Sequence, residues 1–160
     1  MAALKGHHEV VAALIAARAN VDLASNDGAT PLYIAAEKGH REVVTALIAA
    51  GANVDKASSD GGTPLHMAGQ EGHHEVVAAL IAADATVDLA RNDGGTPLLA
   101  AWQNQHLEVV AALLAAGAND VPCFYPSTIV PSAHGFDLAA IVAASREHIA
   151  TEDGAPPLRG

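Results

Sequence analysis

Nine histidines are the residues of this sequence best suited to chemistry, and two short stretches of them begin like a zinc site. Residues 7–9 and 73–75 both read His-His-Glu, as at the start of the zinc-protease motif. That motif needs a further histidine four positions after the first. Ala12 and Ala78 stand four residues after His8 and His74, so the motif is not completed.

Four histidines recur at a constant spacing of 33 residues: His7, His40, His73 and His106. If each spacing is one structural unit, equivalent side chains lie about 10 Å apart. That is too far to share an ion whose bonds measure about 2 Å. We therefore interpret these histidines as helix-start residues that hydrogen-bond locally, and the sequence predicts neither a metal site nor a cofactor.

Other signs of catalysis are weak. The sequence holds neither the G-x-S-x-G turn of many hydrolases nor the Gly-rich loop that holds phosphate groups. Cys123 has no identified base beside it. Asp22, Asp55 and Asp88 share the same 33-residue spacing and are better explained as turn residues that bond the backbone than as paired acids. The sequence predicts a protein without enzymatic activity.

The composition of the chain argues against several classes of protein. Eight Lys and Arg against 18 Asp and Glu give a net charge of −10, which argues against a nucleic-acid partner. A single cysteine excludes an intrachain disulfide and favours an intracellular location. The longest apolar runs have eight residues, whereas a membrane-spanning helix needs about 20. One such run near the start imitates a secretory signal, but nearly the same string occurs four times, so we interpret it as a structural unit.

The 33-residue repeat predicts the elements that position these side chains. Thr30 is a suitable N-cap and Pro31 a suitable first residue for a helix of about two turns, which ends near Gly39. A second helix is expected from about Glu42 to Ala50. Helices this short are marginal alone because nucleation is costly, so they must stack on their neighbours. With 51% hydrophobic but only 3% aromatic residues, burial must come from many thin layers.

The strings DGATPLYIAAEKGHREVV and DGGTPLHMAGQEGHHEVV, followed by a GANVD-like segment, closely resemble the ankyrin-repeat family over about residues 1–120. This resemblance implies an all-α ankyrin-repeat solenoid, in which helix-turn-helix units with β-hairpin loops stack into a slightly curved array. We expect a truncated N-terminal repeat at 1–26 and full repeats at 27–59, 60–92 and 93–122. A degenerate C-terminal capping repeat at 123–150 and a flexible tail at 151–160 are expected to follow.

The resemblance implies binding to a protein partner through the hairpin tips and the concave first-helix face. The charge and the short apolar runs predict neither a nucleic-acid partner nor a membrane. The residues that contact the partner are expected at positions where the repeats differ from one another. The hairpin tips are expected at residues 26 and 29, 59 and 62, and 92 and 95. The candidate contact residues are Asn26, Tyr33, Glu37, Lys38, Ser59, His66, Gln70, Glu71, Asn92, Leu99, Gln103 and Asn104. A polar, mildly acidic surface with few aromatic residues predicts either modest affinity or a basic, extended partner.

A different function is compatible with the same residues. The truncated first repeat leaves an apolar face uncovered, so we expect either a segment of a longer array or a face that is covered by self-association. The second case predicts a self-associating assembly or regulatory domain of a larger protein, such as a homodimer formed through this N-terminal edge. At the other end Trp102 replaces the small residues Ala36 and Gly69 of its column, and we interpret it as an anchor for the terminal cap. Three residues occupy positions expected to be left-handed, where glycine is usual: Arg18, Asp84 and Gln105.

Overall fold

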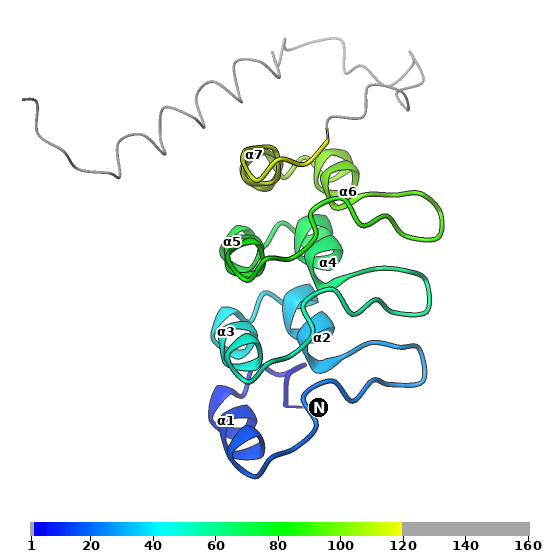
Figure 1. Cartoon of the computed structure of the whole chain (residues 1–160). Coiled ribbons are helices and arrows are strands. Elements are labelled where there is room, and N and C mark those ends of the chain that lie inside the picture. The colour runs from blue at the N-terminus through cyan, green and yellow to red at the C-terminus, as the bar shows by residue number, and fades with distance from the viewer. Residues whose placement is uncertain (1, 120–160) are drawn as a thin grey trace, which may run out of the picture.

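A computed structural model describes residues 2–119 of the chain, and all regular structure in this range is helical. The helices are α1 (His8–Ala16), α2 (Pro31–Glu37), α3 (Arg41–Ala49), α4 (Pro64–Glu71), α5 (His74–Ala82), α6 (Pro97–Gln103) and α7 (Leu107–Ala115). Figure 1 shows α2, α4 and α6 stacked in one column and α1, α3, α5 and α7 in a second, with the connecting loops projecting beside the first. The predicted all-α solenoid is confirmed.

The first helices of the repeats begin as predicted. The Thr30 hydroxyl accepts a hydrogen bond of 3.1 Å from the Tyr33 backbone N–H, and Pro31 is the first helical residue. Thr63 and Thr96 cap α4 and α6 in the same way, each at 3.2 Å. A capping oxygen satisfies one of the free N–H groups at a helix start, and proline loses nothing there because its missing N–H has no helical partner. These three threonines therefore fix where each first helix starts.

The second helices supply most of the large core side chains. In α3, Val43, Val44 and Leu47 are 0–2% exposed, and the equivalent residues of α5 and α7 are equally buried. The bounds of α3 differ from the prediction by one residue at each end. Alanines such as Ala35 and Ala68 fill the space between neighbouring first helices, which pack closely because these side chains are small.

The projecting loops are tight turns without an assigned strand anywhere in residues 2–119, so the expected β-hairpins are reduced to turns. Each turn contains a backbone hydrogen bond of 2.9 Å between its first and its last residue. The bonds run from Ser25 N to Ala29 O, from Ser58 N to Gly62 O and from Arg91 N to Gly95 O. With so few residues between the turn and the helix, the chain reaches the next N-cap before a ladder can extend.

Neighbouring loops are joined through their backbones. Ser59 N donates to Asp27 O and Asn92 N donates to Asp60 O, both at 2.9 Å. Gly28 allows this approach, because a Cβ there would lie 2.9 Å from Ser59 N, and its φ of +82° disfavours other residues. The loop tips therefore form one continuous surface along the array.

The recurring histidines also join repeats, and here the local hydrogen bonding expected from sequence is wrong. The Nε2–H groups of His40, His73 and His106 donate to the carbonyl oxygens of residues 4, 37 and 70, at 3.2, 3.0 and 3.0 Å. Each acceptor belongs to the preceding repeat. The sequence interpretation failed because a side chain at the start of a second helix is closer to the repeat before it than to its own turn.

The recurring aspartates bond the backbone as predicted, but they reach the repeat that follows. Asp22 Oδ1 accepts from Asn53 N at 3.0 Å, and Asp55 Oδ1 accepts from Thr86 N at 2.9 Å. Asp88 Oδ1 accepts from the N–H of residue 119 at 3.0 Å. These carboxylates are therefore occupied in linking one closing segment to the next.

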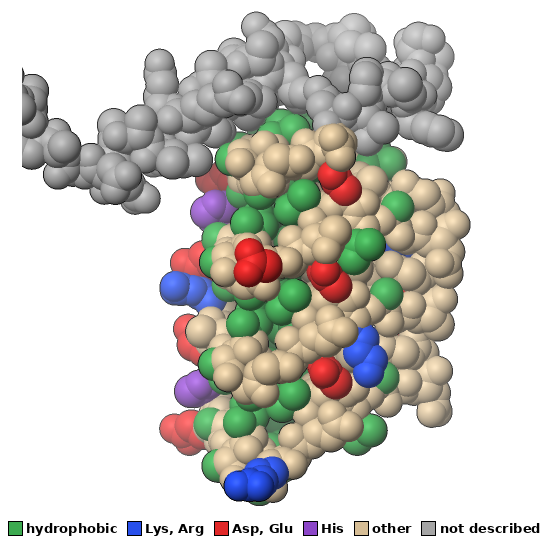
Figure 2. All heavy atoms as spheres, viewed as in Figure 1, with side chains coloured by type: hydrophobic (Ala, Val, Ile, Leu, Met, Phe, Trp, Pro, Cys, Tyr) green, Lys and Arg blue, Asp and Glu red, His purple; other side chains and the backbone are tan. Residues whose placement is uncertain are grey.

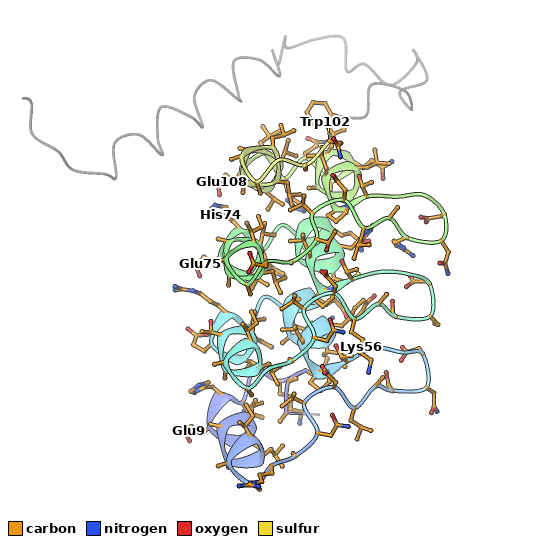
Figure 3. The ribbon with its side chains drawn as sticks, in the orientation of Figure 1. Glu9, Lys56, His74, Glu75, Trp102 and Glu108 are labelled. Carbon is orange, nitrogen blue, oxygen red and sulfur yellow. The ribbon has the colours of Figure 1, made fainter. Side chains whose placement is uncertain are left out.

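Three non-glycine residues were expected to be left-handed, and Trp102 was expected to replace a small residue near the end of the regular repeats. Arg18, Asp84 and Gln105 have φ values of 58°, 60° and 62°, which confirms that these sites are left-handed. Trp102 is half-buried against the core at the last described layer (Figure 3). The cap that it was expected to anchor at 123–150, the tail at 151–160 and Cys123 lie outside the described residues.

Candidate functional site

The candidate contact residues differ widely in exposure. Seven are exposed: Asn26, Lys38, Ser59, Glu71, Asn92, Gln103 and Asn104. Four are half-buried: Tyr33, Glu37, Gln70 and Leu99. The remaining one, His66, is only 2% exposed and offers almost no surface to a partner. All of them belong to the loops or to the first helices and their C-terminal ends.

The loop tips present a fixed arrangement of polar groups. Asn26, Ser59 and Asn92 stand at equivalent places on consecutive loops. The Asn92 amide donates to the Ser59 carbonyl oxygen at 3.1 Å, in addition to the backbone bond between these loops. Because the tips are held to one another, a partner that contacts several of them meets a preorganised surface.

Three exposed acids at the tips, Asp27, Asp60 and Asp93, were missed as contact candidates because they are the same in every repeat. Hydrogen bonds from the Ser25 hydroxyl and from the Ala29 N–H lower the pKa of Asp27. Bonds from the Ser58 hydroxyl and the Gly62 N–H, followed by the charge of Arg91, lower the pKa of Asp60. The recurring Asp-Gly pair was the sequence signal, and it was assigned to turn formation alone.

The ends of the first helices are polar and mostly satisfied within the chain. Lys38 Nζ lies 2.6 Å from Glu37 Oε1, and this exposed ion pair raises the pKa of Lys38. Gln70 Nε2 donates to Glu71 Oε1 at 3.0 Å. The Asn104 amide donates to the carbonyl oxygen of residue 100 at 2.8 Å. Their helices, α2, α4 and α6, stack in one column, so these side chains recur at equivalent helix ends along the array (Figure 1).

The column that holds Tyr33, His66 and Leu99 lies where the first helices meet the loops. Burial, together with the charge of Arg91, lowers the pKa of His66 to about 4, so the ring is neutral at pH 7. Its Nδ1 is buried without a hydrogen-bond partner in the described part of the chain. Tyr33 is half-buried, and burial raises the pKa of its hydroxyl. The column therefore lies partly in the core, although two of its three residues, Tyr33 and His66, are polar.

Two of the hollows on the surface of the described residues contain no candidate contact residue in their lining. One of about 340 Å³ lies between α1 and the first loop, and one of about 510 Å³ lies over α3 and α5. Within residues 2–119 no three His, Cys, Asp or Glu side chains are grouped so that they could hold a metal ion. No helix in this same range has the length and apolar character to cross a membrane.

Comparison with known proteins identifies the repeat. A family model described as ankyrin repeats (3 copies) matches residues 1–58 and 49–122. A search of curated protein sequences found no match to the chain. Ankyrin repeats are generally protein–protein interaction modules and are typically non-catalytic. The matched segments cover most of the chain and agree with the stacked helical pairs of the structure, so the chain belongs to the ankyrin-repeat family.

Proposed function

We propose that this chain binds a partner protein through one side of the array and catalyses no reaction. We call this side the loop-tip surface. It consists of Asn26, Asp27, Tyr33, Glu37, Lys38, Ser59, Asp60, Gln70, Glu71, Arg91, Asn92, Asp93, Leu99, Gln103 and Asn104. The proposal omits His66 because it is buried, and adds the acids at the tips and Arg91 beside them.

The observation that carries the proposal is the separation of variable and constant positions. Positions that pack the repeats together hold the same residues in successive units, such as Leu47, Leu80 and Leu113, and are 0–2% exposed. First-helix ends differ from unit to unit and are mostly exposed, as with Lys38, Glu71 and Asn104. The packing of one repeat against the next explains why the buried positions are constant. Contact with a partner explains why the exposed positions vary.

The charge of the loop-tip surface favours a basic partner. Five acids stand against two bases, Lys38 and Arg91, and each of these bases is paired with one of the acids. The excess of three negative charges is distributed over the tips and the first-helix ends of three successive repeats. An extended segment with several Lys or Arg residues can contact all three repeats, and complementary charge speeds its encounter with this surface.

The test is a selection of random 12-residue peptides, displayed on phage, against the whole chain. We expect the selected peptides to carry positive net charge. Glu71→Lys, within the loop-tip surface, should weaken their binding about tenfold, since an attractive charge becomes repulsive. The matched control is Glu75→Lys. Glu75 is also exposed, belongs to the same repeat and points away from the loops (Figure 3), so its change should alter binding less than about twofold.

Two results would contradict the proposal. One is a set of selected peptides without positive charge whose binding is indifferent to Glu71→Lys. The other is equal weakening by both variants, which would mean that total charge rather than this surface determines binding. Circular dichroism of both variants checks that the helices are retained.

A further inference from the structure

Arg91 is the residue by which the third loop differs in charge from the first two. Ser25 and Ser58 occupy its position in those loops. Each serine hydroxyl donates to the carbonyl oxygen of the last residue of its own turn, at 2.9 and 3.1 Å. The third turn forms without such a hydroxyl, because the Arg91 backbone N–H still donates to the Gly95 carbonyl oxygen at 2.9 Å. The arginine side chain is therefore not needed for its own turn.

The Arg91 side chain reaches back to the loop of the preceding repeat. Its Nη2–H donates to Asp60 Oδ2, and its Nε lies 4.0 Å from Oδ2 of Asp93 in its own loop. The Arg91 side chain is 26% exposed, whereas those of Asp60 and Asp93 are 47% and 67% exposed. One guanidinium group therefore lies between the acids of the second and third loop tips and offsets their charge.

The first loop tip has no such base. Within residues 2–119 no basic side chain forms an ion pair with Asp27. Lys38, the other base of the loop-tip surface, is paired with Glu37 beside it. On the face that Figure 2 presents, Lys and Arg side chains stand singly rather than in clusters, so one base can determine the charge of its surroundings. The three loop tips are alike in backbone but differ in charge.

Stability does not account for Arg91. An ion pair with a half-exposed carboxylate contributes little to the free energy of unfolding, because water and salt screen it. Arg91 Nε is buried and has no hydrogen-bond partner among the described residues, which lowers the stability of the folded state. A serine would avoid this cost and would bond its own turn, as in the other two loops. The effect of Arg91 on the charge of the loop-tip surface explains its presence better.

A basic residue of a partner that approaches the second and third loop tips meets Arg91. It must compete with the guanidinium for Asp60 and is repelled by a like charge. The exposed acids Asp27 and Glu71 belong to the same surface and are free of ion pairs within the described part of the chain. The surface therefore attracts basic residues at some positions and disfavours them at one.

We propose that Arg91 determines the specificity of the loop-tip surface: the basic residues of the partner lie over Asp27 and Glu71, and an uncharged or acidic residue lies opposite Arg91. Neighbouring repeats are about 10 Å apart, and an extended chain rises about 3.3 Å per residue. One repeat therefore corresponds to about three residues of the partner, so its basic residues are concentrated toward one end of the segment. This inference rests on the proposed function and specifies its partner further.

The test compares the whole chain with its Arg91→Ser variant, which has the residue of the other two loops. Random 12-residue peptides displayed on phage are selected separately against the two proteins. We expect the peptides selected on Arg91→Ser to carry basic residues along more of their length. They should bind that variant about tenfold more tightly than the wild type, because the repulsion is removed. Arg91→Lys keeps the charge and should disfavour these peptides as the wild type does.

The matched control is Arg41→Ser. Arg41 is exposed, is the first residue of α3 in the other column of helices, and forms no ion pair in the described range. Its change alters the net charge by the same amount and should change the binding of these peptides less than about twofold. Circular dichroism checks the helices of each variant, and Arg91→Gln is a second uncharged variant should Arg91→Ser lose helicity.

Three results would overturn the proposal. The peptides selected on Arg91→Ser could bind the wild type equally well, Arg41→Ser could strengthen their binding as much, or Arg91→Lys could bind them as tightly as Arg91→Ser. The Glu71→Lys variant keeps this test separate from that of the proposed function. If Glu71→Lys weakens binding while Arg91→Ser has no effect, only the role of Arg91 is wrong. If neither change affects binding, the proposed function is wrong as well.

Discussion

Tyr33, His66 and Leu99 show how one sequence position acquires different environments in successive repeats. His66 is buried beneath the following loop, where an added Cβ on Gly95 would lie 3.7 Å from its Cε1. Tyr33 and Leu99 are each half-buried. Burial disfavours the charged form of the His66 imidazole, so this side chain stabilises the folded state only while it is neutral.

The depressed pKa of His66 predicts a specific pH dependence of stability. The unfolded residue takes up a proton below about pH 6.5, whereas the folded residue does so only near pH 4. Between these values the unfolded state binds more protons, so the free energy of unfolding falls as the pH is lowered. At pH 5 the loss is about 2 kcal/mol relative to pH 7.5.

Urea denaturation of the wild type and of His66→Leu at both pH values measures this effect. Leucine occupies the equivalent position at Leu99, so the variant has a precedent within the array. The stability of the wild type relative to the variant should fall by about 2 kcal/mol from pH 7.5 to pH 5. The comparison removes the contribution of the many carboxylates common to both proteins. A constant difference would contradict the assigned pKa.

Sequence predicted some residue environments and missed others for a physical reason. Arg18, Asp84 and Gln105 were expected to be left-handed because they replace a glycine in a regular pattern, and they are. The burial of His66 depends on the loop of the next repeat, which no local pattern describes. The same holds for the acids at the loop tips, whose turn-forming role was visible while their shared surface was not.

At the scale of elements, the glycine before each second helix and the histidine of the next repeat form one unit. Gly72 has a φ of +78°, and a Cβ on it would lie 2.4 Å from His106 Nδ1. The His106 ring lies over this glycine while its Nε2–H bonds the carbonyl oxygen of residue 70. Gly51 also has a positive φ, of +82°, but an added Cβ there has open space.

This contrast predicts unequal costs for two identical substitutions. Gly51→Ala should lower the free energy of unfolding by about 1 kcal/mol, the backbone cost of a left-handed alanine. Gly72→Ala should cost roughly 1–3 kcal/mol more, because the His106 ring must also move. Chemical denaturation of both variants measures the difference, and placing them in a His106→Ala background should remove most of it. Equal costs in the wild-type background would show that the ring does not restrict this position.

The helices were predictable because their signals are local. Thr30 and Pro31 mark the start of α2, and the stripe of Val43, Val44 and Leu47 marks the buried side of α3. The connections between repeats were not predictable in the same way. The recurring histidines and aspartates were assigned to their own turns, whereas their partners lie about one repeat away in sequence.

At the scale of the molecule, the array separates two tasks. Leu47 and its equivalents hold neighbouring repeats together, whereas the first-helix ends of the loop-tip surface differ between repeats. The stacked architecture followed from the 33-residue period, because short helices persist only by packing on one another. The distribution of charge over its surfaces became clear only once each residue was placed.

If partners bind along the loop-tip surface, a selected basic peptide should protect that surface from amide hydrogen exchange in the whole chain. We expect slower exchange in the loops at residues 25–29, 58–62 and 91–95 and in α2, α4 and α6, with little change in α3, α5 and α7. Slower exchange confined to α3, α5 and α7, or to α1, would contradict it.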